Sequence, residues 1–199
     1  MTQPVICLAS ASPRRSALLD QIGIAHVIAA AEIDESLRGG ESPEDYVLRL
    51  SREKAAVIAA QPARSQGLPV LGADTSVVIG EVVLGKPATA PESRRMLEQL
   101  SGREHRVLSA VTLHGPAGPQ SRLSTTTVRF RRLDDDEIDA YWRSGEPRDK
   151  AGGYAVQGLA AVFVEHLAGS YSGVMGLPLF ETAALLAESG IHRRVGTDS

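Results

Sequence analysis

The sequence predicts an α/β protein in which helices flank a mixed β-sheet. Two observations indicate this fold. Apolar runs typical of buried strands alternate with helical patterns, and two further strand patterns follow each other around a Gly- and Pro-rich turn. A helical bundle or a β-sandwich would lack this alternation. The length of 199 residues fits a single domain spanning residues 1–199.

Each element follows from its local pattern. Strands are expected at residues 4–10, 68–80, 105–114 and 123–133, with a turn at 115–120. Helices are expected at residues 13–23, 43–60, 90–102, 134–145 and 177–190, because each begins at an N-capping residue or ends at a glycine. The expected N-caps include Ser12, Ser42 and Thr89. The Gly-punctuated segment 151–169 is expected to be rich in β-structure, and the tail after the last helix to be mobile.

The composition excludes several classes of protein. A formal net charge of −3 provides no overall attraction for nucleic acid, so a polyanion would have to bind at a local site. The single cysteine, Cys7, excludes an internal disulfide and fits a reducing compartment. The sequence shows neither a secretory leader pattern nor an apolar run of the roughly 20 residues that span a bilayer. We therefore expect a cytoplasmic protein with no membrane and no nucleic acid polymer as partner.

Two adjacent arginines follow the first predicted strand, in the stretch LASASPRR. The first N–H groups of a helix lack partners, and the helix dipole places partial positive charge there. Arg14 and Arg15 would add planar sets of donors that match phosphate oxygens, and Ser10 and Ser12 would add hydroxyl groups. The stretch predicts a polyphosphate site, although it fits equally a capped helix with solvated arginines.

Two charged residues lie where apolar residues are expected. Asp74 interrupts a buried strand pattern, and Lys54 lies within the apolar stripe of the helix predicted at 43–60. Because burying a carboxylate is costly, Asp74 is either a structural residue that caps a loop, or a metal ligand or general base. Lys54 either extends its ammonium group to solvent or meets a buried anion.

An acidic segment and the histidines bear on metal binding. Glu32, Asp34 and Glu35 follow the first predicted helix, where they either are solvated or supply oxygen ligands to a divalent ion that bridges phosphates. The five histidines show no pair at the spacing of a zinc site. His105, at the start of a strand, is therefore interpreted as structural.

The motifs taken together resemble one family. Over about residues 5–185 the sequence is similar to the Maf family of nucleoside triphosphate pyrophosphatases, with the motifs LASASPRR, REKA, GADT, LGKP, SGREHRV, GEPRDKAGGYAVQG and GSYSGVMGLP in family order. The resemblance implies a Maf/ITPase-like fold, with two lobes around a central cleft, and a homodimer. It also implies hydrolysis of a nucleoside triphosphate substrate to the monophosphate and pyrophosphate, with a divalent metal cation (Mg²⁺, Mn²⁺ or Co²⁺) as cofactor.

The resemblance assigns roles to particular positions. Asp74 matches the proton acceptor of the family. The positions that match phosphate-binding residues are Ser10, Arg14, Arg15, Lys54 and Lys86. Those that match metal ligands are Glu35 and Asp74, with Glu32 aligned less securely. The positions that match specificity determinants are Arg14, Thr75 and Gln157.

The segment DKAGGYAVQG resembles the branch of the family that acts on dTTP and UTP. The amide of Gln157 can donate and accept, so it suits the O4/N3 edge of uracil or thymine, although a turn glutamine bonded to backbone fits as well. Two alternatives stay open: a 7-methyl-GTP pyrophosphatase, and a nucleotide-binding regulator of cell division and septum formation. The sequence departs from the family pattern at Ser109, where threonine is common, and at Gly173, where a larger residue is common.

Overall fold

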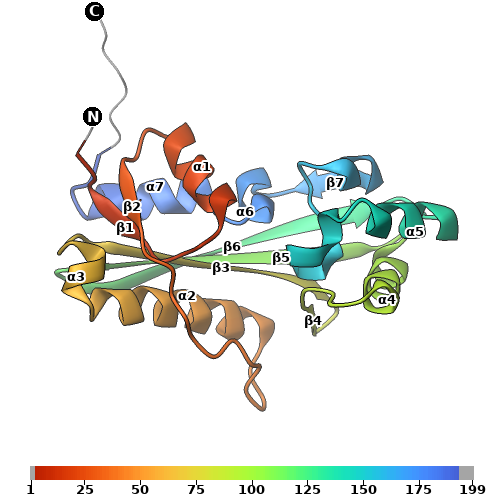
Figure 1. The fold of residues 1–199 in the computed structure, drawn as a ribbon, viewed down its shortest axis with the longest axis horizontal. Helices are drawn as coiled ribbons and strands as arrows, with labels where there is room; N and C mark the ends of the chain where they lie inside the picture. The colour runs from red at the N-terminus through yellow and green to blue at the C-terminus, as the bar shows by residue number, and fades with distance from the viewer. Residues whose placement is uncertain (1–2, 193–199) are drawn as a thin grey trace, which may run out of the picture.

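The structure is a computed structural model that describes residues 3–192, and it contains a seven-stranded mixed sheet (Figure 1). The strands are β1 (Ile6–Leu8), β2 (His26–Ile28), β3 (Val70–Ile79), β4 (Val82–Leu84), β5 (Glu104–Gly115), β6 (Gly118–Phe130) and β7 (Val164–Ala168). The helices are α1 (Pro13–Gln21), α2 (Pro43–Ala59), α3 (Pro62–Ser65), α4 (Ala90–Leu100), α5 (Asp135–Arg143), α6 (Tyr171–Met175) and α7 (Leu179–Glu188). Three 3₁₀ segments complete the described part: η1 (Glu146–Asp149), η2 (Ala151–Gly153) and η3 (Leu159–Phe163).

The sheet combines a parallel end with an antiparallel end. Its strands lie in the order β2-β1-β3-β5-β6-β7, and β4 pairs with β3. β1 runs parallel to β2 and β3, whereas the other pairs are antiparallel. β5 and β6 are paired up to Gly115 and Gly118, so their connection is only residues 116–117 and the turn is shorter than the predicted 115–120.

Helices cover both faces of the sheet. α2 packs along β3 and β5 on one face, and α1, α6 and α7 lie on the other (Figure 1). Side chains alternate between the faces of a strand. Successive residues of β3 therefore face different helical layers, which decides how the site is built.

Two lobes share the long strands β3, β5 and β6 (Figure 1). In one lobe, β1, α1 and α7 bury a core that includes Leu8, Leu19 and Leu185. In the other, α4, α5 and the 3₁₀ segments bury a core around Phe130 and Tyr141. The predicted mixed sheet with flanking helices and two lobes is confirmed.

The predicted helices are present, but not every cap is. Ser42 and Thr89 accept hydrogen bonds from the backbone three residues later, as expected. Ser12 occupies the N-cap position of α1, yet its side chain makes no capping hydrogen bond. The tail expected to be mobile lies largely outside the described residues. Within residues 3–192, none of the helices combines the length and the apolar character that crossing a membrane requires.

The expectation of β-rich structure across residues 151–169 is wrong. Only β7 is a strand, and η2 and η3 occupy most of the rest. In η3, Ala160 and Phe163 are buried, whereas Leu159 and Val162 are exposed. The two members of each pair are three residues apart, which is the period of a 3₁₀ helix. Because both faces of η3 carry apolar side chains, this period is hidden in the sequence, and the segment looks like a buried strand.

Candidate active site

The cleft opens where one edge of β3 has no partner. On that edge β1 pairs with Val70 and Leu71, and β4 pairs from Val77 onward. Among the described residues, no strand covers the edge between these two pairings. A cavity of about 490 Å³ lies at this gap, between the two lobes.

The cavity wall contains nine of the ten residues to which the resemblance assigns a role. These residues are Ser10, Arg14, Arg15, Glu35, Lys54, Asp74, Thr75, Lys86 and Gln157. They come from the β1–α1 junction, the loop before α2, α2 itself, β3, the loop after β4 and the segment after η2. Glu32, the less securely aligned carboxylate, is not part of the wall.

A buried lysine joins two carboxylates on the α2 face of β3. The Nζ atom of Lys54 lies 2.7 Å from Asp74 Oδ1 and 2.7 Å from Glu35 Oε1. Lys54 and Asp74 are each 7% exposed. Lys54 therefore does not extend its ammonium group to solvent. It contacts anions inside the protein, as the second expectation had it, and these anions are carboxylates of the chain itself.

Close packing of α2 on β3 makes this contact possible. A Cβ atom on Gly72 would lie 2.3 Å from the backbone oxygen of Ser51 and 2.7 Å from the backbone nitrogen of Ala55. Any side chain at this position would therefore push α2 away from the strand. Gly72 and Asp74 are two residues apart and face the same helix, so the approach at Gly72 brings Lys54 to the carboxylate.

Two side chains of α2 hold the loop that carries Glu35. The hydroxyl of Tyr46 donates to the backbone oxygen of Glu35 at 2.8 Å, and Arg49 Nη2 donates to that of Ser36 at 3.0 Å. Arg49 is itself fixed by two hydrogen bonds to Glu41, at 2.6 and 2.8 Å. Sequence reasoning missed these residues, because tyrosine and arginine on a half-exposed helix face carry no distinctive pattern.

The charges at this face affect the acidity of its groups. Partial burial works to raise the pKa of Glu35, but the hydrogen bond and charge of Lys54, with smaller contributions from Lys86 and Arg15, lower it overall. Burial, together with the charges of Asp74 and Glu35, raises the pKa of Tyr46 to about 12. Tyr46 is therefore protonated at neutral pH and can act as the hydrogen-bond donor to Glu35.

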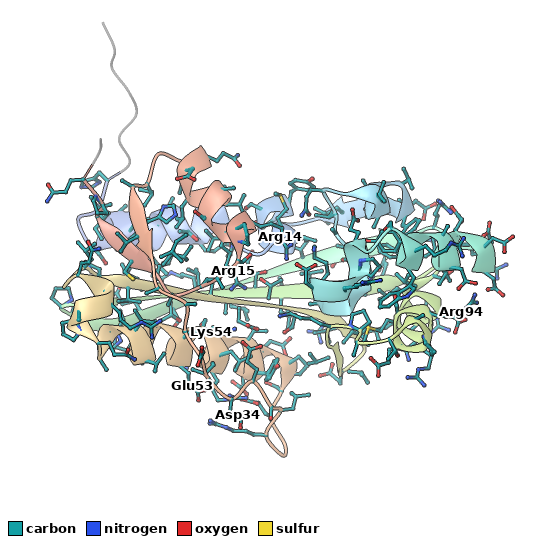
Figure 2. All side chains as sticks on the ribbon, in the orientation of Figure 1. Arg14, Arg15, Asp34, Glu53, Lys54 and Arg94 are labelled. Atoms are coloured by element: carbon teal, nitrogen blue, oxygen red, sulfur yellow. The ribbon has the colours of Figure 1, made fainter. Side chains whose placement is uncertain are left out.

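The arginine pair lies on the other side of the sheet from Lys54 (Figure 2). Arg15 donates from Nε to the backbone oxygen of Gly176 at 2.8 Å and from Nη1 to Ser10 Oγ at 3.1 Å. Burial lowers the pKa of Arg15, and Asp74 opposes this effect. Arg14 is more open to solvent and lies 3.6 Å from Asp149 across the cleft.

The hydrogen bonds of Ser10 determine what it offers a ligand. Its Oγ accepts from the backbone N–H of Ser12 at 3.2 Å as well as from Arg15. A serine hydroxyl has two acceptor positions and one donor proton. Since both acceptor positions are occupied, the proton of Ser10 is left to donate, which suits a phosphate oxygen.

The opposite face of β3 carries a chain of neutral hydrogen bonds. Thr75 Oγ1 lies 2.9 Å from Ser109 Oγ on the paired strand β5. Ser109 Oγ donates in turn to the backbone oxygen of Gly173 in α6 at 2.6 Å. Ser109 and Gly173, the two positions that depart from the family pattern, are thus in direct contact.

The remaining predicted residues lie at the more open parts of the wall. Lys86 is exposed in the loop after β4, Gln157 is exposed after η2, and both line the cavity. Tyr154, which sequence reasoning did not select, also lines the cavity and bonds to His105 Nε2 at 2.8 Å. His105 is 3% exposed, in keeping with its structural interpretation.

The carboxylates fit a divalent cation that shares its coordination with the substrate. Glu35 and Asp74 both contact the same ammonium group, so their oxygens converge on one point. Residues 3–192 contain no cluster of three or more His, Cys, Asp or Glu residues suited to a metal. Mg²⁺ is commonly held by one or two carboxylates together with substrate phosphates, and these two carboxylates match that donor set.

Comparison with known proteins identifies the family. The family described as Maf-like protein matches residues 5–189. A dTTP/UTP pyrophosphatase of Alkalilimnicola ehrlichii is 53% identical over 190 residues, covering 94% of this chain and 93% of that protein. Proteins of the same name from Hahella chejuensis and Methylobacillus flagellatus are 48% and 51% identical; each alignment covers 94% of this chain, with 92% and 93% of the relatives. Together with the mixed sheet and its two-lobed cleft, these matches establish that the chain belongs to the Maf family.

Proposed function

We propose that this protein is a nucleoside triphosphate pyrophosphatase that hydrolyses dTTP and UTP to the monophosphate and pyrophosphate. One observation carries the proposal: a single cavity gathers Arg14, Arg15 and Lys86 around a cluster in which the buried Lys54 contacts both the buried Asp74 and the more exposed Glu35. Triphosphate binding needs the cations, and hydrolysis needs a group that positions water. The names of the relatives point to the same reaction.

Asp74 acts on the attacking water. Its contact with Lys54 is made through Oδ1, so we assign the water to Oδ2. The water attacks the α-phosphorus and gives a proton to this carboxylate, while the bond from the α-phosphorus to the bridging oxygen breaks. The electron pair of that bond leaves with pyrophosphate. In the absence of bound metal and substrate, Lys54 holds the carboxylate in this orientation.

The cationic side chains hold the triphosphate and the departing pyrophosphate. Arg15 is fixed by Gly176 and Ser10, so its guanidinium is positioned before the substrate arrives. Ser10 donates its free proton to a phosphate oxygen. The side chains of Arg14 and Lys86 are more exposed to solvent. Their positive charges stabilise the negative charge that develops on the departing pyrophosphate.

A divalent cation completes the site. Glu35 and Asp74 would hold it, with the substrate phosphates as further ligands. When bound, it supplies charge neutralisation on the phosphate oxygens. Lys54 is then free to contact a phosphate, the role that the family resemblance gives it.

Gln157 supports a pyrimidine as the base. Its side chain lines the cavity, and a primary amide can donate a hydrogen bond to a ring carbonyl of uracil or thymine. A 7-methyl-GTP pyrophosphatase would keep the same phosphate chemistry with another base. A regulator without turnover would gain little from Asp74, which adds negative charge beside the phosphates.

A substrate panel tests the proposal. The purified protein is incubated with dTTP, UTP, CTP, GTP and 7-methyl-GTP, with Mg²⁺, Mn²⁺ or Co²⁺ in turn, and the nucleotide products and pyrophosphate are measured. We expect dTMP or UMP with equimolar pyrophosphate. Release of inorganic phosphate with a nucleoside diphosphate would contradict α–β cleavage. Cleavage of 7-methyl-GTP alone would assign the other branch, and metal-dependent binding without turnover would support the regulator.

A further inference from the structure

The hydrogen bonds around Thr75 have a fixed direction. Ser109 is 1% exposed and lies directly opposite Thr75 in the β3–β5 pairing. Its hydroxyl has a single proton, and the short 2.6 Å contact to the carbonyl of Gly173 uses that proton, because a carbonyl oxygen only accepts. In the 2.9 Å contact between the two hydroxyls, Thr75 must therefore be the donor.

This direction leaves Thr75 as an acceptor only. Its single proton is committed to Ser109, so only lone pairs of Oγ1 remain for a ligand in the cavity. Ser10 shows the reverse arrangement, with both acceptor positions taken and its proton free. The cavity therefore presents a hydroxyl donor at the β1–α1 junction and a hydroxyl acceptor on β3. A phosphate oxygen suits the first, and an N–H group suits the second.

We propose that Ser109 is a specificity-positioning residue: by taking the proton of Thr75, it makes that hydroxyl an acceptor for the N3–H of a uracil or thymine ring. The inference rests on the proposed function and adds a reason for base selection. Cytosine has no proton on N3, so its ring nitrogen would face an oxygen lone pair with no proton between them. A site built for a hydrogen bond rejects an analogue that leaves its buried group unpaired.

The test compares substrate ratios in two Ser109 variants. In Ser109→Ala, the hydroxyl of Thr75 loses its acceptor and can turn its proton toward the ligand. We expect the ratio of kcat/KM for UTP to that for CTP to fall by about tenfold or more. Ser109→Thr retains a hydroxyl that can donate to Gly173, so it should preserve the ratio. Both variants are checked for folding by thermal unfolding, since Ser109 is buried.

N3-methyl-UTP provides an independent test, because its methyl group replaces the N3 proton that would form the hydrogen bond to Thr75. We expect the wild-type protein to use it at least about tenfold less well than UTP. A purely structural role for Ser109 would lower activity on UTP and CTP together and leave their ratio unchanged, which would overturn the inference. Wild-type activity on CTP or N3-methyl-UTP equal to that on UTP would also overturn it. No pyrophosphate from UTP in the wild-type protein would instead refute the proposed function itself.

Discussion

The two faces of β3 carry their polar groups in different ways. On the face toward α2, Asp74, Lys54 and Glu35 are charged and joined by ion pairs. On the opposite face, Thr75 is neutral, and its hydrogen bonds run through Ser109 to a backbone carbonyl. Adjacent residues of one strand thus present different chemistry to one cavity. Changes on the charged face should affect turnover of every substrate, and so should changes at the phosphate-binding Arg14 and Arg15, which lie on the other side of the sheet from Lys54. Changes to the neutral hydrogen bonds of Thr75 should instead affect the choice among substrates.

The largest expected effect comes from Asp74→Asn, which preserves shape but removes the base. We expect kcat to fall by about 10²–10⁴-fold for both dTTP and UTP, the usual contribution of acid–base catalysis. The loss should be equal for the two substrates, because the group acts on the phosphate and not on the base. Asp149→Asn, an exposed carboxylate at the same cavity, is the control and should change kcat only slightly. Turnover of Asp74→Asn close to that of the wild type would contradict the assignment.

The neutral face has a pH dependence of its own at His105. Burial lowers the pKa of His105 from 6.5 to about 4. Between these values the unfolded chain binds a proton that the folded chain does not, so stability decreases as the pH falls through this range. The loss attributable to this residue is on the order of 3 kcal/mol.

Chemical denaturation across the acidic range measures this effect. The stability of His105→Gln should decrease less steeply toward acid than that of the wild type, because the contribution of the histidine is removed. A decrease remains in both proteins, since their carboxylates still titrate. His166→Gln, at an exposed position on β7, is the matched control and should follow the wild-type curve. Parallel curves for His105→Gln and the wild type would mean that the ring is protonated in the folded protein.

The third prediction concerns replacement of Lys54, which tests whether its ammonium group occupies the position of the metal. Its ammonium group contacts both carboxylates that we assign to the cation, so the two positive charges compete for them. Lys54→Met should lower kcat, yet strengthen Mn²⁺ binding in the absence of nucleotide by about tenfold, because a like charge is removed. Binding is measured directly by calorimetry or by the electron paramagnetic resonance signal of free Mn²⁺. Lys86→Met is the control, and unchanged or weaker Mn²⁺ binding in Lys54→Met would refute the competition.

The charged face could be predicted from sequence more fully than the neutral one. Lys54 and Asp74 interrupt apolar patterns, and that interruption is visible without a structure. Their pairing is not visible, because it depends on how closely α2 approaches the strand at Gly72. Thr75 and Ser109 are ordinary strand residues by pattern, so the direction of their hydrogen bonds appears only once β3 and β5 are placed in register.

The smallest expected effect comes from the support of the charged face, at Tyr46. Tyr46→Phe removes the hydrogen bond to the backbone of Glu35 but keeps the ring, and one such bond contributes about 0.5–1.5 kcal/mol. If that bond positions Glu35 for the cation, the metal concentration at half-maximal rate should rise about two- to tenfold, with kcat at saturating metal nearly unchanged. Direct Mn²⁺ titration should weaken in the same proportion. Tyr171→Phe, at a half-exposed tyrosine of α6, controls for the loss of a hydroxyl elsewhere. A fall in kcat at saturating metal would instead place Tyr46 in the chemical step, and the charged face would then extend one residue further into the cavity than its ion pairs indicate.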